Sequence, residues 1–116
     1  MNIEEYLQRP EYTQIAILRR LRVLGGVKAT DVALAIHRSQ GNLTLMENGR
    51  YPATEEVIQA YAAYLEEALH LKRRGLYDVL TRLSDVYPVY SPLAQKHPID
   101  YIAVYIREMC GGGDPE

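Results

Sequence analysis

The stretch that most constrains this fold is residues 30–50, TDVALAIHRSQGNLTLMENGR, which has the pattern of two short helices joined by a tight turn. The first half has the apolar spacing of a helix over residues 30–36, carried by Val32, Ala33 and Ile36. The second half predicts a helix over residues 40–47, capped by Ser39, whose hydroxyl can accept a backbone N–H. Gly49 ends that helix, because glycine takes the left-handed conformation without strain.

Two helices of this size with so short a turn between them predict a helix-turn-helix, whose second helix can lie in the major groove of DNA. In the second helix Leu43 and Met46 share one face, which we expect to pack on the core. The opposite face is then free to contact a ligand.

Helical patterns occupy most of the remaining chain, so we expect an all-α fold. These further helices are predicted at residues 2–9, 12–24, 54–74, 76–86 and 98–109. Pro10 is expected to end the first of them, and Thr54 to cap the third. A proline-rich loop precedes the last helix.

We divide the chain into a helix-turn-helix DNA-binding domain of about five helices over residues 1–74, a C-terminal helical extension over 75–110 and a disordered tail over 111–116. The extension is expected to serve dimerisation or partner binding. Its large apolar residues, which we expect at a dimer contact, are Ile99, Ile102, Tyr105, Ile106 and Met109.

Between positions 19 and 65 lies a set of residues that indicates a known family when taken together, although each residue alone is a weak signal. It consists of Leu21, Arg22, Gly26, Val27, Val32, Ala33, Ile36, Ser39, Leu43, Met46, Glu47, Asn48, Gly49, Arg50 and Pro52. In this order and spacing it resembles the Cro/phage-repressor family of helix-turn-helix domains, the xenobiotic-response-element type. The resemblance implies a transcriptional regulator, a repressor, that reads a palindromic operator in double-stranded DNA as a homodimer.

The start and end of the first helix of the motif depart from the family pattern. Lys28 stands where a small capping residue is usual, and Ala29 where a glutamine is usual, so we expect Thr30 to cap instead. His37 stands where a glycine is common, and a left-handed backbone there carries a steric cost.

The resemblance also implies an ion pair between Arg22 in the helix before the motif and Glu47 at the end of the second helix. Such a pair would lock the two helices together. The alternative is that both charges are simply solvated.

Base contacts are expected near the start and along the exposed face of the second helix. These positions are Gln40, Gly41, Thr44 and Leu45. Gln40 can bond adenine through its amide, and Leu45 can pack on a thymine methyl, so the chemistry favours an A·T-leaning or shape-read site. The alternative is that Leu45 is merely an exposed apolar residue and that Gly41 merely weakens the helix.

Phosphate contacts are expected from polar and cationic residues around the same helix. These are Lys28, Arg38, Ser39, Asn42, Asn48 and Arg50. For Asn48 a purely structural role, ending the helix before glycine, is an equal alternative.

The charge distribution agrees modestly with this placement. The chain has a net charge of −2, but residues 1–52 carry seven Lys and Arg against five Asp and Glu, whereas residues 53–116 carry six against ten. The basic excess therefore coincides with the helix-turn-helix.

Other function classes find little support in the sequence. One cysteine and three separated histidines give no metal site, no glycine-rich phosphate loop is present, and no serine has a catalytic context, so we expect neither enzyme activity nor a cofactor. No apolar run has the length of a membrane span, and the start lacks a signal-peptide pattern, so we expect a cytoplasmic protein with no membrane association.

Two alternatives remain open at this point. The chain could be an antitoxin-type regulator whose C-terminal extension binds a toxin or another regulator. It could also be a protein-interaction or RNA-binding module that uses this fold without reading duplex DNA.

Overall fold

The computed structural model describes residues 2–71, 75–86, 102 and 106–107, and all regular structure in these ranges is helical. The helices are α1 (Ile3–Tyr6), α2 (Pro10–Leu24), α3 (Ala29–Ala35), α4 (Gln40–Glu47), α5 (Glu55–Ala68) and α6 (Leu76–Val86). The prediction of an all-α fold with a helix-turn-helix is therefore confirmed, with α3 and α4 as the two helices of the motif.

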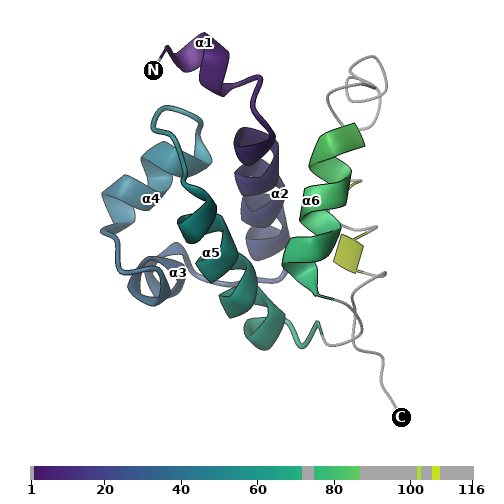
Figure 1. Ribbon diagram of the computed structural model, residues 1–116. Helices are drawn as coiled ribbons and strands as arrows, with labels where there is room; N and C mark the ends of the chain where they lie inside the picture. Colours follow the sequence, from purple (N-terminus) through teal and green to yellow (C-terminus); the bar gives the residue numbers. More distant parts are fainter. Residues whose placement is uncertain (1, 72–74, 87–101, 103–105, 108–116) are drawn as a thin grey trace.

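Helices α2 and α5 form the centre of the molecule (Figure 1). The motif helices α3 and α4 lie on one side of this pair and α6 lies on the other. A single apolar core runs through all of them, from Leu43 of α4 through Leu18 of α2 and Ile58 of α5 to Leu80 of α6. Helix α6, which the sequence assigns to the extension, thus shares one core with the helix-turn-helix.

Four successive helices end in the same hydrogen-bonded motif, in which a left-handed residue follows the last turn. The left-handed residues are Gly26, His37, Gly49 and His70, with φ angles of 73°, 61°, 75° and 57°. In each case the next residue's N–H bonds back to a carbonyl five positions earlier, as Arg38 N does to Ala33 O at 2.9 Å. This is the Schellman ending, and it lets each short helix stop abruptly and reverse direction.

Two of the predicted helix starts are wrong. Pro10 begins α2 instead of ending the preceding helix, because proline has no N–H to lose in a first turn and its fixed φ suits that position. Thr30 does not cap α3, which starts one residue earlier with Lys28 as its N-cap. The Val27 carbonyl accepts a hydrogen bond from Arg22, which holds the chain just after the Gly26 turn. From there the chain enters α3 at Ala29.

The predicted end of α5 at residue 74 is also wrong. The helix stops at Ala68, because His70 adopts the left-handed conformation and Leu71 turns back into the core with 3% of its surface exposed. The Glu66 carboxylate then accepts the Leu76 N–H at 2.5 Å, which fixes the start of α6 beside the end of α5. The predicted cap at Thr54 is confirmed, since its hydroxyl accepts the Val57 N–H.

The predicted dimer residues are only partly described. Ile106 is fully buried in the core of its own chain, so its side chain is a core residue here and is not presented to a partner. Ile102 is half-buried against the same core. Ile99, Tyr105, Met109, the proline-rich loop and the tail over 111–116 lie outside the described residues.

The left-handed conformation of His37 predicts that His37→Gly stabilises the protein. A side chain in this conformation costs about 1 kcal/mol that glycine does not incur, so the free energy of unfolding should rise by up to that amount. Chemical denaturation measures the change. His37→Ala is the control, because it removes the imidazole but keeps the steric cost; equal stability of the Gly and Ala variants would contradict this account.

Candidate nucleic-acid interface

The four predicted base-contact residues lie together on the exposed side of α4. Gln40, Gly41, Thr44 and Leu45 are all exposed, while Leu43 and Met46 on the other side are buried. The helix begins at Gln40 because the Ser39 hydroxyl accepts the Asn42 N–H at 3.0 Å, as expected for an N-cap. It ends at Glu47, where Gly49 supplies the left-handed residue.

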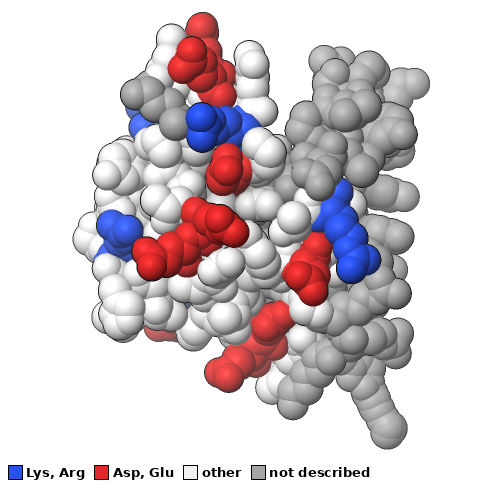
Figure 2. Space-filling model, viewed as in Figure 1, with Lys and Arg blue, Asp and Glu red and all other residues white. Residues whose placement is uncertain are grey.

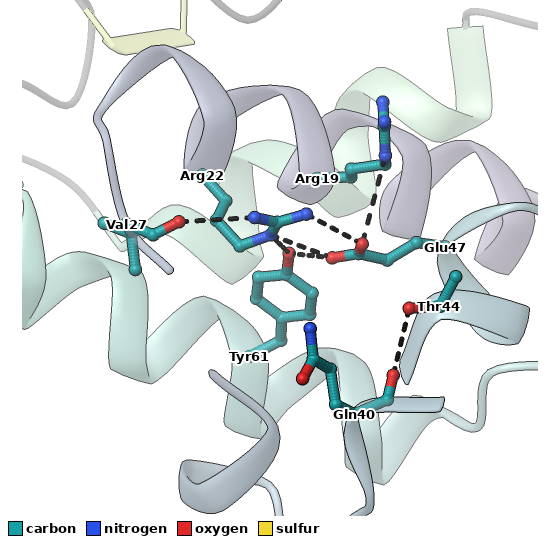
Figure 3. Close-up of polar contacts among 7 residues, drawn as sticks. All are labelled: Arg19, Arg22, Val27, Gln40, Thr44, Glu47 and Tyr61. Atoms are coloured by element: carbon teal, nitrogen blue, oxygen red, sulfur yellow. Dashed lines mark hydrogen bonds and ion pairs between the residues drawn. The ribbon is translucent and has the colours of Figure 1, made fainter. Parts of the chain in front are cut away.

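Thr44 and Gln40 offer different groups to a ligand. The Thr44 hydroxyl donates to the Gln40 carbonyl at 3.0 Å, one turn earlier, as Figure 3 shows. Its proton is thus engaged, which leaves an oxygen acceptor and a methyl group on the surface. The Gln40 side chain is exposed and retains both donor and acceptor groups of its amide.

The other two positions add no polar group. A Cβ added to Gly41 would meet nothing within 4 Å, so this part of α4 is open to the close approach of another molecule. Leu45 has 44% of its surface exposed, although it is a large apolar residue. The exposed strip of α4 is therefore neutral, with one amide, one hydroxyl oxygen and apolar groups.

The residues predicted to contact phosphate flank this strip. Because the Ser39 oxygen accepts the Asn42 N–H, its own O–H remains available as a donor. Asn42 is only half-exposed, and its Oδ1 is buried without a hydrogen-bond partner among the described residues. Ser39 is accordingly the better placed of the two for an external contact.

The cationic candidates are exposed at the helix ends. Arg38 lies in the turn before α4, and Arg50 lies just after it, next to the exposed Asn48. Lys28 is exposed at the N-cap of α3. Positive charge is thus available on both sides of the neutral strip.

The two residues for which the resemblance implies an ion pair lie directly against each other (Figure 3). Arg22 Nη2 donates to Glu47 Oε1 at 2.9 Å and Arg22 Nε donates to Glu47 Oε2 at 3.1 Å, a two-pronged contact. The Glu47 side chain is 4% exposed and that of Arg22 12% exposed. Arg19 lies further away, 3.9 Å from Glu47 and 44% exposed, so solvent screens its contribution.

Two further groups complete this buried network, and sequence reasoning missed both. The Tyr61 hydroxyl of α5 accepts from Arg22 Nε at 3.0 Å and donates to Glu47 Oε2. The Val27 carbonyl accepts from Arg22 Nη1 at 3.2 Å. A tyrosine in the apolar stripe of α5 was the available signal, because a buried tyrosine usually finds a hydrogen-bond partner for its hydroxyl.

The network shifts the pKa values of two of its members, Tyr61 and Arg22, in the direction that its hydrogen bonds require. Burial and the nearby Glu47 carboxylate raise the pKa of Tyr61 well above its ordinary value, so its hydroxyl stays protonated and can donate. Burial alone would lower the pKa of Arg22, but the hydrogen bonds that Arg22 donates to Glu47 and Tyr61 and its electrostatic attraction to them together outweigh burial, so the pKa is raised.

Acidic side chains gather over α5 and the start of α6 on the face seen in Figure 2. Phosphate groups approaching over α5 and the start of α6 would therefore meet negative charge. In the described part of the chain no His, Cys, Asp or Glu residues cluster in a way that could hold a metal ion. None of the described helices combines the length and apolar character that crossing a membrane requires.

A family model described as a helix-turn-helix domain matches residues 16–75, from α2 to the start of α6. Comparison with curated proteins gives no match, and comparison with solved structures gives none either.

The buried network predicts that Glu47→Ala destabilises the free protein. The substitution leaves the Arg22 guanidinium buried without its counter-charge, which costs about 3–5 kcal/mol of unfolding free energy. Thermal or chemical denaturation without any ligand measures the loss. Glu67→Ala, which removes an exposed carboxylate from α5, is the matched control and should change little. Equal stabilities of the two variants would show that the Arg22–Glu47 pair contributes nothing.

Proposed function

The chain belongs to the Cro/C1-like family of helix-turn-helix domains, and on that premise we propose that it is a sequence-specific DNA-binding regulator of transcription. The observation that carries the proposal is the exposed strip of α4 held rigidly on the core by the Arg22–Glu47 pair. A recognition helix discriminates better between bases when its backbone is held in one orientation before binding, because its side chains then start from a defined position.

The groups on the strip support a preference for A·T base pairs. The Gln40 amide matches the N6 and N7 edge of adenine, whereas the Thr44 methyl and Leu45 match the C5 methyl of thymine. The strip carries no arginine, the residue that most often reads guanine. Ser39, Arg38, Asn48 and Arg50 would contact phosphates on either side.

We further propose that the protein acts as a homodimer on a palindromic site. One short recognition helix reads only a few base pairs, too few to select a site within a genome. Two copies related by a two-fold axis would place their recognition helices about one helical turn, roughly 34 Å, apart.

Repression is the effect that DNA binding alone produces, because a protein bound across a promoter occupies DNA that the polymerase needs. We therefore propose a repressor without catalytic activity.

Selection of duplexes from a random library tests the proposal. We expect enrichment of palindromic sequences rich in A·T pairs, with half-sites one helical turn apart. Gln40→Ala and Thr44→Ala should each lower discrimination at one position of the half-site by about 1–3 kcal/mol while the fold remains intact.

The matched control for Gln40→Ala is Gln59→Ala, which removes an exposed amide from α5 instead of α4. If no duplex is enriched, the protein is not a sequence-specific regulator. If duplexes are enriched but both α4 variants select the wild-type sequence, α4 is not the reading helix.

Arg38→Ala and Arg50→Ala should weaken binding to every duplex alike. Each loses a phosphate contact, so the slope of log affinity against log salt concentration should flatten by about one unit per contact. Titrations over a range of salt concentrations measure the slope. Arg82→Ala on α6, across the molecule from α4, is the control and should keep the wild-type slope. A variant with an unchanged slope would place its arginine outside the interface.

A further inference from the structure

The N-terminal segment of residues 3–12 precedes the residues that match the family and contacts the turn that follows α4. Its Tyr6 is a fully buried aromatic residue, with 1% of its surface exposed. The Tyr6 hydroxyl accepts the backbone N–H of Ala53 at 2.8 Å, across 47 residues of sequence. One end of the segment 48–53 is thereby tied to α1.

The other end of that segment is held by packing. A Cβ added to Gly49 would lie 2.5 Å from Tyr12 Cε1 and 2.8 Å from Leu7 Cδ2, so these two side chains rest directly on the glycine. The rings of Tyr6 and Tyr12 meet edge to face, with centroids 5.8 Å apart. The contacts at Gly49 and at Ala53 therefore come from one connected aromatic unit.

Between these two anchored points the chain carries exposed side chains just after the end of α4. Arg50 and Tyr51 are both exposed, and the backbone N–H groups of both bond to the Leu45 carbonyl. Asn48 precedes them, also exposed. The position of these residues relative to α4 thus depends on the N-terminal segment as well as on α4 itself.

We propose that residues 3–12 position the turn after α4 for DNA binding, with Tyr6 as a positioning residue that sets the phosphate contact of Arg50. The exposed Glu4 and Glu5 would repel phosphate, so the segment acts through that turn and not by touching DNA. This inference rests on the proposed function. Tyr6 does not touch DNA; it fixes the turn from which Arg50 reaches the phosphate. A residue that only filled the core would affect stability but would not couple specifically to Arg50.

The test is Tyr6→Phe, which keeps the ring in place and removes only the acceptor for the Ala53 N–H. Gln8→Ala, an exposed position in the same segment, is the control. In the free protein, the amide of Ala53 should exchange faster with solvent, and the amide resonances of Gly49 and Arg50 should shift. With a selected duplex, at a temperature where the variant is fully folded, the salt slope should flatten by up to about one unit.

A double-mutant cycle with Arg50→Ala separates positioning from stability. If Tyr6 acts through Arg50, Tyr6→Phe should weaken binding in the wild-type background and have little further effect in the Arg50→Ala background. Base preference should remain that of the wild type. The inference is overturned if the two substitutions act additively, or if Tyr6→Phe leaves affinity and salt slope unchanged.

The failure of the proposed function has a different signature. A wild-type chain that binds no duplex would overturn that function and this inference together. A wild-type chain that binds, beside a Tyr6→Phe variant that binds equally well, would overturn the inference alone.

Discussion

The Arg22 guanidinium joins α2, α4, α5 and the loop before α3, and the position of α4 depends on it. Its N–H groups bond to Glu47, Tyr61 and the Val27 carbonyl. Helix α4 has only eight residues, too few to be stable alone, so tertiary contacts must hold it. Apolar packing of Leu43 and Met46 buries one face but is not directional. The ion pair is directional. Its two hydrogen bonds can both form in only one relative orientation of α2 and α4, so the pair fixes that orientation.

The features that could be predicted from the sequence are those that depend on interactions between residues close together in the chain. Ser39 and Gly49 marked the ends of α4, and the apolar spacing gave its buried face, because capping and periodicity act within a few residues. Spacing could not show the Tyr61 hydroxyl in the network, since periodicity predicts that a residue is buried but not which polar group it meets. The Arg22–Glu47 pair came from family resemblance alone, for the same reason. The misplaced end of α5 followed from His70, a residue type that only sometimes takes the left-handed conformation.

Proline and tyrosine account for the remaining features that the sequence did not predict. Pro10 was expected to break a helix, yet proline is as well suited to beginning one, and only the neighbouring backbone decides between the two outcomes. The abundance of tyrosine without phenylalanine or tryptophan gave no prediction of function. In the structure the buried Tyr6 and Tyr61 each bond through the hydroxyl to a distant part of the chain. Each of these tyrosines therefore packs its ring in the core and makes a long-range hydrogen bond with its hydroxyl.

The Schellman endings explain how the neutral exposed strip of α4 comes to be flanked by two cationic residues. After α2 and α5 the residue beyond the left-handed position is apolar, Val27 or Leu71, and packs on the core, as is common in this motif. After α3 and α4 the same position holds Arg38 and Arg50, which are exposed. Their backbone N–H groups bond to the Ala33 and Leu45 carbonyls at 2.9 Å, so the backbone at both positions is tied to the end of the preceding helix. After α3 and α4 an exposed positive charge thus takes the place of an apolar core residue, one before α4 and one after it. Under the proposed function, this arrangement would place phosphate contacts at the two ends of α4 and base contacts along the strip.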